Sequence, residues 1–400
     1  MPRLLRDLPR EVGVLTAVAF AVAVGFGVVA PAIPVFAREF GVGVTAAGAV
    51  ISAFALMRLV SALAGGRLVD RFGERTVLAT GIGIVAVSSL LAGLAQNYIQ
   101  LLGLRGVGGI GSAMFTVSAY TLLLRVAGPE QRGRASGLFQ SGFLIGGIAG
   151  PFIGGVLTSI SIRAPFFVYA GTLAVAGLIG IVFLSHARLD DTPRTDDDVP
   201  QRTGLAAALR NSAYRAALTT NFAVGWSLFG VRASLIPLFV IEGLRRDAIW
   251  IGIGFAISAI AQALTLLPAG RFVDTVGRRP AMIFGGALAA VSMLLLALDG
   301  SVVAYGVSML LFGIASGFLG TAPAAVVGDV VTGRGGTVVA AFQMASDLGA
   351  IIGPILAGWL VDGYSYSTAW LATAAVLAVA TLASAFAPET QRRQSSPAAP

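Results

Sequence analysis

Long apolar stretches divide the chain into segments that are separated by short, charged connections. Residues 12–37, 76–104, 135–162, 248–270 and 300–328 contain no aspartate, glutamate, lysine or arginine. Each of these stretches exceeds the ~20 residues with which a helix crosses a bilayer. The whole pattern predicts twelve membrane-spanning helices, over about 12–36, 45–66, 76–95, 98–125, 134–158, 164–186, 213–241, 248–270, 280–298, 301–327, 336–361 and 365–387. We therefore expect an all-α, polytopic membrane protein.

The composition supports a membrane protein and argues against most enzymes. The mean hydropathy is +0.86 and charged residues make up 12% of the chain, about half of the ~25% that is usual in soluble domains. The chain has no cysteine and a single histidine, His186, so disulfides and thiolate metal sites are excluded. A membrane enzyme, which would need a nucleophile with its base or a metal cluster, is the remote alternative. The sequence also has no lysine and hence no phosphate-binding loop of the GxxxxGK type. We expect no cofactor.

The arginines predict how the helices are oriented. With a cytoplasmic N-terminus, most arginines fall in segments on the cytoplasmic side, whereas Arg38, Arg163, Arg245 and Arg246 fall outside. Such a bias is the positive-inside rule of membrane proteins. The formal charge of +8 is thereby explained without nucleic acid as a partner. We expect a multi-pass protein of the cytoplasmic (inner) membrane with both termini in the cytoplasm and the lipid bilayer as its partner.

An internal repeat relates the two halves of the chain. The phrase "FGVVAPAIPVF" (Phe26–Phe36) returns as "FGVRASLIPLF" (Phe229–Phe239), and "GGIAGPFIGG" (Gly146–Gly155) returns as "GAIIGPILAG" (Gly349–Gly358). The charged phrase "GGRLVDRFGERT" between the second and third helices returns as "AGRFVDTVGRRP" between the eighth and ninth. Repeats in the same orientation are typical of transporters whose site lies between two halves.

We therefore predict two six-helix bundles related by pseudo-two-fold symmetry. Their expected limits are 1–186 for the first bundle, 187–212 for a cytoplasmic linker, 213–387 for the second bundle and 388–400 for a cytoplasmic tail. The linker is rich in Asp, Pro and Thr, and such a composition favours a flexible, solvated segment. The tail is expected to be disordered.

These motifs resemble those of the major facilitator superfamily, and of its twelve-helix drug:proton antiporter branch, over about residues 10–390. The charged-loop motif of that family, G-x-x-x-D-[RK]-x-G-[RK]-[RK], is matched twice. The first copy matches at Gly66, Asp70, Arg71, Gly73 and Arg75 and departs at Glu74, and the second matches at Gly270, Asp274, Gly277, Arg278 and Arg279 and departs at Thr275. The antiporter motif of the fifth helix is matched at Gly137, Gly146, Gly150, Pro151, Gly154 and Gly155.

The resemblance implies mechanical roles for both motifs. The charged loops would contact the opposite half and act as conformational latches of the outward-facing state; arginine clusters that only set the topology are the alternative. Gly146, Gly150 and Gly154 form a small-xxx-small ladder that lets a neighbouring helix approach closely, and Pro151 removes a backbone hydrogen bond. The fifth helix would thus seal the substrate cavity, although plain helix packing also explains its glycines.

Three ionisable residues deep in the helices are candidates for proton coupling. Arg105 matches the R-x-x-x-G-x-G-x-A pattern of the fourth helix, and the resemblance implies a part in proton transfer. Asp347 is the one carboxylate deep in a predicted helix, about 16 Å from the cytoplasmic end, and Arg58 lies about 12 Å from that end. We hypothesise an ion pair between Asp347 and Arg58 that protonation breaks. A static pair, and a purely structural Arg105, are the alternatives.

The resemblance implies a cavity lined by helices from both bundles. The candidate lining residues are Phe26, Phe115, Gln140, Trp226, Phe229, Arg232, Phe312 and Gln343. Apolar and aromatic walls suit hydrophobic small molecules, and the arginines favour anionic or neutral ones. We expect a monomeric secondary active transporter that exports such drugs or metabolites by proton antiport with alternating access. Uptake or sugar and metabolite permeation, by symport or facilitated diffusion, is the alternative.

Overall fold

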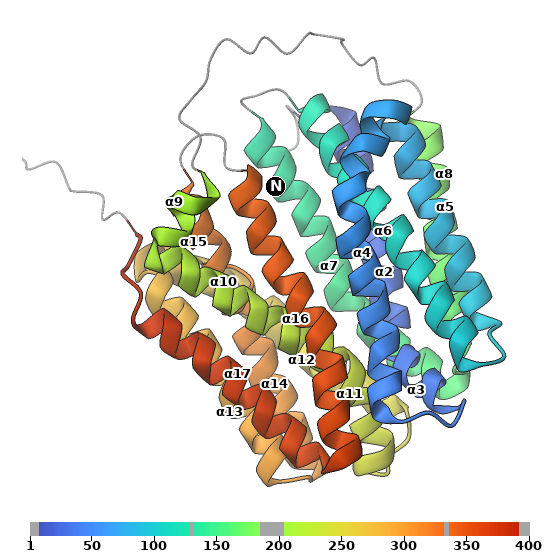
Figure 1. Ribbon diagram of the computed structural model, residues 1–400, viewed down its shortest axis with the longest axis vertical. Coiled ribbons are helices and arrows are strands. Elements are labelled where there is room, and N and C mark those ends of the chain that lie inside the picture. Colours follow the sequence, from blue (N-terminus) through green and yellow to red (C-terminus); the bar gives the residue numbers. More distant parts are fainter. Residues whose placement is uncertain (1–7, 128–130, 185–203, 332–335, 392–400) are drawn as a thin grey trace, which may run out of the picture.

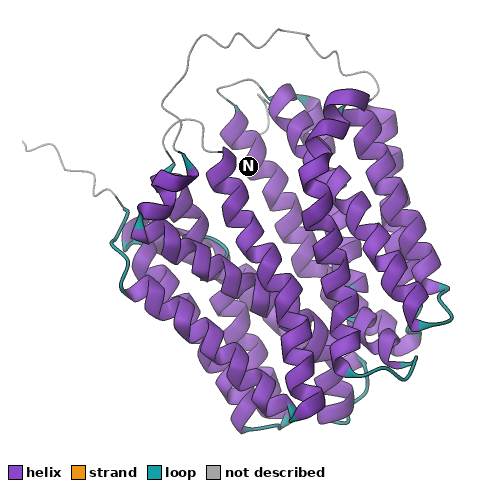
Figure 2. Cartoon of the chain, in the orientation of Figure 1, coloured by secondary structure: helices purple, strands orange, loops and turns teal. Residues whose placement is uncertain are grey.

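The computed structural model describes residues 8–127, 131–184, 204–331 and 336–391, and these residues form helices without any strand (Figures 1 and 2). Twelve helices in this part of the chain are long and apolar enough to cross a membrane. The fold class expected from the sequence is thereby confirmed.

The first half of the chain supplies six spans. They are formed by α2 (Arg10–Val29) with α3 (Ala32–Arg38), α4 (Val44–Phe72), α5 (Glu74–Gly93), α6 (Tyr98–Val126), α7 (Arg132–Ile160) and α8 (Ala164–Leu184). The second half repeats the arrangement. Its elements are α9 (Leu205–Arg210), α10 (Ser212–Val224), η1 (Gly225–Val231), α11 (Arg232–Leu238), η2 (Phe239–Gly243), α12 (Ile249–Thr275), α13 (Arg278–Leu298), α14 (Val302–Leu319), α15 (Ala322–Val330), α16 (Gly336–Gly363) and α17 (Tyr366–Ala385).

Three spans that the hydrophobic pattern predicts as continuous are interrupted. The first breaks at Ala30 and Pro31, and the tenth breaks at Gly320 and Thr321. The seventh span contains two π-helical stretches, η1 and η2. Such stretches are rare and concentrate at functional sites, and η1 directly precedes Arg232.

The segments outside the spans are more ordered than the composition suggests. Within the range expected as a linker, Leu205–Arg210 forms the helix α9, and Ala208 is buried with Tyr214 in an apolar cluster of the second half. Residues 389–391 of the expected tail are held by hydrogen bonds to the start of α13, to α15 and to the end of α12. Residues 187–203 of the linker and 392–400 of the tail lie outside the described residues.

The two halves meet at one end of the bundle. We use the name charged-loop end for the end of the bundle where α4 is followed by Gly73 and α12 leads to Gly277. The opposite end, where α4 begins and α16 finishes, is called the far end. The halves contact each other mainly through α4 with α16 and α7 with α12, and also through α3 with α11. Figure 1 shows α4 and α16 side by side toward the far end, which is its lower edge.

Candidate functional site

An ion pair joins the two halves about mid-way along α4 and α16. The Nη2 group of Arg58 in α4 donates to Oδ1 of Asp347 in α16. Their side chains are 40% and 20% exposed, respectively. The pairing expected from the similar depths of these residues is therefore confirmed, and within the described ranges it involves the one carboxylate that lies far from the helix ends.

A second set of bonds closes the interface at the far end. The carboxylate of Asp362, near the end of α16, accepts hydrogen bonds from the backbone N–H groups of Val44 and Thr45 at 2.8 Å each. It also accepts one from the Thr45 hydroxyl at 2.6 Å. Two turns further along α4 toward the ion pair, Ser52 Oγ donates to the Ile351 carbonyl at 2.7 Å. Asp362 thus satisfies the free N–H groups at the start of a helix that belongs to the other half.

A third contact at the far end is ionic. Arg38 Nε, at the end of α3, donates to Glu242 Oε1 in η2 at 2.7 Å. The Tyr366 hydroxyl, at the start of α17, donates to Glu242 Oε2 at 3.1 Å. The sequence analysis missed these residues. The sequence held one indication of these contacts: Arg38, Glu242 and Asp362 each lie at the end of a span, and these three ends are on the same side of the membrane.

Glycines allow the helix backbones to touch where the halves cross. A Cβ atom at Gly48 would lie 2.6 Å from the Pro354 carbonyl oxygen, and one at Gly358 would lie 2.7 Å from Thr45 Cα. On the other side of the interface, a Cβ atom at Gly155 of α7 would collide with the backbone of Gly252 in α12. Pro354 and Gly358 are the repeat counterparts of Pro151 and Gly155, so the same motif contributes to both crossings.

The fifth-helix motif divides into parts with different surroundings. A Cβ atom at Gly146 would lie 2.6 Å from the Phe20 carbonyl oxygen, and one at Gly150 would lie 2.5 Å from that of Val24. Gly154 faces Val28, and Pro151 packs on Gly27. The ladder therefore packs within the first half against α2, whereas Gly155 reaches the second half. Gly137, by contrast, has no atom within 4 Å of a Cβ placed on it among the described residues.

The first charged loop makes its described ion pair within its own half. Gly73 has φ = 79°, a backbone conformation that favours glycine. Asp70 and Arg71 are exposed, and Asp70 has no ion-pair partner among the described residues. Glu74, which departs from the family pattern, is buried and receives two hydrogen bonds of 3.0 Å from Nη1 of Arg125 in α6. The departure at Glu74 thus creates an internal ion pair.

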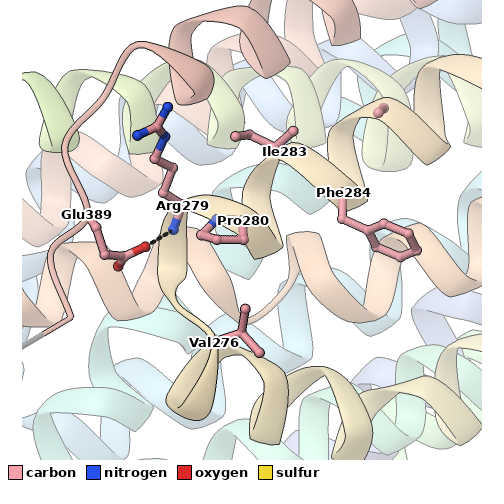
Figure 3. A pocket seen from close by; sticks show the side chains of 7 residues that line it. Val276, Arg279, Pro280, Ile283, Phe284 and Glu389 are labelled. Atoms are coloured by element: carbon pink, nitrogen blue, oxygen red, sulfur yellow. Dashed lines mark hydrogen bonds between the residues drawn. The ribbon is translucent and has the colours of Figure 1, made fainter. Parts of the chain in front are cut away.

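The second charged loop is fastened to the end of the described chain. Gly277 has φ = 138°, and the backbone N–H groups of Arg278 and Arg279 donate to Glu389 at 2.9 and 3.0 Å. The Arg278 side chain donates to Asp329 at 3.1 Å. A hollow of about 660 Å³ opens beside this loop, lined by Val276, Arg279, Pro280, Ile283, Phe284, Ala287 and Glu389 (Figure 3).

This hollow lies at the charged-loop end of the second half, and none of the predicted cavity residues lines it. Val276 and Phe284 in its wall are about half exposed, which indicates a surface groove. No group of three potential metal ligands occurs in the described part of the chain.

The predicted cavity residues have diverse environments. Phe115 and Trp226 are buried in the helix core, and the Trp226 indole donates to Thr373 of α17 at 3.3 Å. The half-buried Phe26 lies 5.6 Å, between ring centroids, from Phe54. The exposed members of the set are Gln140, Phe229 and Gln343. The remaining two, Arg232 and Phe312, are buried and stacked on each other.

Arg105 is 2% exposed, and its guanidinium carbon lies 4.5 Å from the centroid of the Phe54 ring. Its Nε has no hydrogen-bond partner. The structure therefore places Arg105 one helical turn of α4 away from Arg58, because Phe54 and Arg58 are four residues apart.

Comparison with known proteins identifies relatives over almost the whole chain. The family model described as "Major Facilitator Superfamily" matches residues 15–247 and 234–400. Multidrug resistance protein 1 of Bacillus subtilis is 26% identical over 369 residues, which cover 90% of this chain and 93% of that protein. An uncharacterised MFS-type transporter of Methanocaldococcus jannaschii is 25% identical over 89% of this chain and 92% of its own length. The quinolone resistance protein NorA of Staphylococcus aureus is 30% identical over 171 residues, which cover 42% of this chain and 43% of NorA.

Solved structures share the fold at lower identity. A bacterial homologue of the human lysosomal transporter Spinster, inward-facing and unoccupied, superposes with a TM-score of 0.74 at 17% identity, over 94% of this chain and 96% of its own. A POT family transporter in complex with a thioalcohol-conjugated peptide superposes with a TM-score of 0.77 at 14% identity, over 94% and 96% of the two chains.

Proposed function

Because this chain belongs to the major facilitator superfamily, we propose that it exports hydrophobic small molecules in exchange for protons by alternating access. It is a multi-pass membrane transporter. A relative over 90% of its length is named a multidrug resistance protein, and one over 42% of its length is named a quinolone resistance protein. Those names support export of drug-like molecules. Exchange against protons rests on the charged residues within the helices.

The direction in which the molecule is open follows from the arginines. The charged-loop end carries the arginine-rich connections, and the positive-inside rule places such connections in the cytoplasm. The bonds between the halves described above extend from Arg58 and Asp347 to the far end. The far end is then the outside, and this conformation is closed to the outside. In it the hydrogen bonds and ion pairs described above for each charged loop lie within its own half, and the proposed latch, a contact of each loop with the opposite half, would form when the molecule opens outward.

The observation that carries proton antiport is the ion pair between Arg58 and Asp347. In the empty, deprotonated transporter this pair links α4 to α16 and holds the closed far end. Protonation of Asp347 removes the negative charge and releases the link. A substrate that engages Arg58 also releases it. Either event breaks the ion pair, whereas the empty, deprotonated protein keeps it. Substrate and proton are therefore carried in alternate steps. Arg105, one turn from Arg58, is proposed to assist that transfer.

The test uses the purified protein in proteoliposomes with an imposed pH gradient. Wild type, Asp347→Asn and the matched control Asp247→Asn, an exposed loop residue, are assayed for lumenal pH and for uptake of a fluorescent hydrophobic drug. We expect wild type and the control to accumulate the drug against its gradient while protons leave. Asp347→Asn mimics the protonated state, so it should still equilibrate the drug without moving protons.

Two results would contradict the proposal. Drug movement without proton flux in wild type would identify a facilitator. Proton-driven accumulation that survives in Asp347→Asn would show that coupling occurs elsewhere, and the ion pair would then be a structural one.

A further inference from the structure

Arg232 is a buried cation without a counter-charge. It is 9% exposed, and its buried Nε has no hydrogen-bond partner among the described residues. In the described part of the chain no carboxylate forms an ion pair with it, and the deep carboxylate Asp347 is already paired with Arg58. A charge in such a place is costly unless it is paired, so an anionic partner supplied from outside the chain would stabilise it.

Aromatic rings cover the faces of the guanidinium but leave its edge unsatisfied. The guanidinium carbon lies 4.7 Å from the centroid of the Phe255 ring in α12 and 5.4 Å from that of Phe312 in α14. Cation–π contacts of this kind satisfy the flat faces. The N–H donors, by contrast, point outward in the plane of the group. A planar oxyanion that arrives in that plane would be gripped by two parallel hydrogen bonds.

A second unsatisfied polar group lies on the same wall. Ser258 is fully buried, and its Oγ has no hydrogen-bond partner. Ser258 follows Phe255 by three residues in α12 and therefore lies on the same face of that helix. Gly313, the neighbour of Phe312, packs directly against the Ser258 backbone. Two unsatisfied polar side chains, Arg232 and Ser258, thus belong to one cluster of three helices.

The local backbone also fits a binding site. Arg232 is the first residue after the π-helical stretch η1, Gly225–Val231, and Gly230 of that stretch packs against Pro354 of α16. The helix α16 also carries Asp347 and contacts α4 of the other half. A ligand on Arg232 would therefore influence the same helix that carries the proposed coupling residue.

From this cluster we propose that Arg232, with Ser258, binds the carboxylate of the transported molecule, and that the preferred substrates are aromatic carboxylates. The proposal rests on the export function argued above and names its substrate class. The rings of Phe255 and Phe312, which are 4% and 1% exposed in this conformation, would contact the body of such a molecule once it has entered. A free inorganic anion has the same charge chemistry but would make no use of these rings.

The test measures binding by isothermal titration calorimetry to the full chain in nanodiscs. The probes are 2-naphthoate, its neutral methyl ester and 2-naphthylmethylammonium, each with and without excess sodium phosphate. We expect naphthoate to bind at least tenfold more tightly than the ester, the ammonium compound to bind most weakly, and phosphate not to compete. Arg232→Gln should bind naphthoate and ester equally, and Arg271→Gln, an exposed arginine in α12, should behave as wild type.

A purely structural Arg232 gives a different result. If the guanidinium lacks a partner, Arg232→Met should leave the melting temperature of the ligand-free protein unchanged or raise it, whereas a structural cation would make it fall. Should neither arginine variant fold, Ser258→Ala, which removes one buried oxygen, is expected to weaken naphthoate binding about threefold to tenfold and leave ester binding unchanged.

Three outcomes would overturn the proposal. They are equal binding of naphthoate and ester to wild type, no binding of either, and displacement of naphthoate by phosphate alone, which would indicate an inorganic anion site. None of them depends on proton coupling. The proteoliposome assay can therefore succeed while this inference fails, and the reverse is also possible.

Discussion

Asp362 of the second half caps the first turn of α4 in the first half, with its carboxylate 2.8 Å from the backbone nitrogens of both Val44 and Thr45. A helix cap normally comes from the residue that precedes the helix. Here that residue is Gly43, which has no side chain to offer. The N–H groups of Val44 and Thr45 therefore have this protein acceptor only while the far end is closed, and the cap couples a local backbone requirement to the conformation of the whole molecule.

Replacement of Asp362 by alanine should favour the open far end. Hydrogen bonds to a charged group contribute about 1.5–3 kcal/mol each when buried, and this site is partly exposed, so we expect a shift of about tenfold in the ratio of open to closed molecules. The chain has no cysteine. Spin labels at Glu39→Cys and Tyr364→Cys can thus be placed directly, and their distance measured by double electron–electron resonance. If Asp362→Ala leaves the distribution of spin-label distances unchanged, the bonds of Asp362 do not hold the far end closed.

Addition of a methyl group at Gly48 should also hinder closure. The new Cβ would lie 2.6 Å from the carbonyl oxygen of Pro354, and such overpacking costs about 1–3 kcal/mol. We expect Gly48→Ala to lengthen the far-end distance and slow export. Gly83→Ala is the matched control, since nothing lies within 4 Å of a Cβ there among the described residues. Equal effects of the two substitutions would point to helix propensity instead.

Arg58 and Asp347 should behave as an interacting pair in a double-mutant cycle. Arg58→Gln leaves the Asp347 carboxylate without its partner, and Asp347→Asn leaves the guanidinium without its own. Each single substitution should therefore destabilise the closed state, and the double substitution should cost less than their sum by about 1–3 kcal/mol. The melting temperature in nanodiscs and the far-end spin-label distance both report this. Arg58→Gln combined with Asp299→Asn, at a loop of the other half, should be additive.

The contact between Glu389 and the second charged loop should depend on pH. Burial acts to raise the pKa of Glu389, but hydrogen bonds from the backbone N–H groups of Gln391, Arg278, Arg279 and Thr390 outweigh it and lower the pKa below the ordinary 4.5. The ionised form is thus favoured in the folded protein. Its contribution is present above pH 4.5 and is lost as the pH falls through the lowered pKa.

We expect Glu389→Gln to lower stability at pH 7 by about 1 kcal/mol, the usual value of a helix cap, with solvent screening acting to reduce it. The difference from wild type should vanish once the pH is below the pKa of Glu389. Melting temperatures at pH 7 and at acidic pH, compared with Glu39→Gln as an exposed control, measure this. A difference that persists unchanged in acid would show that the Glu389 charge is not involved.

The sequence predicts the spans well because each is a long apolar run that must be helical in a bilayer. The pairing of Arg58 with Asp347 was also predictable, since both charges lie at similar depth and the resemblance to the family implies that the second and eleventh helices face each other. The interruptions within the spans were not predictable from the sequence. The π-helical stretches next to Arg232 and Pro237 depend on packing against neighbouring helices, to which a hydrophobic pattern is blind.

The contacts of the far end escaped prediction for a related reason. Asp362 and Glu242 sit at ends of spans, where a charged residue is unremarkable by composition, and their partners come from the opposite half. The docking of Glu389 on α13 is similar, because a polar tail rich in Gln, Ser and Arg is typical of disorder and only the free N–H groups of Arg278 and Arg279 give it a place to bind. Trp226, expected in a cavity, instead finds its hydrogen-bond partner on α17.

The cap on α4 has a consequence for how this protein can vary in evolution. On one side two of the three bonds come from peptide N–H groups, which every amino acid except proline carries. These two bonds demand no particular side chain at residues 44 and 45, although Val44 is buried and the Thr45 hydroxyl donates the third bond, whereas Asp362 is exchangeable at most for another short acceptor. A comprehensive library of single substitutions should find a narrow tolerance at 362, apolar replacements tolerated at 44, and proline excluded at 44.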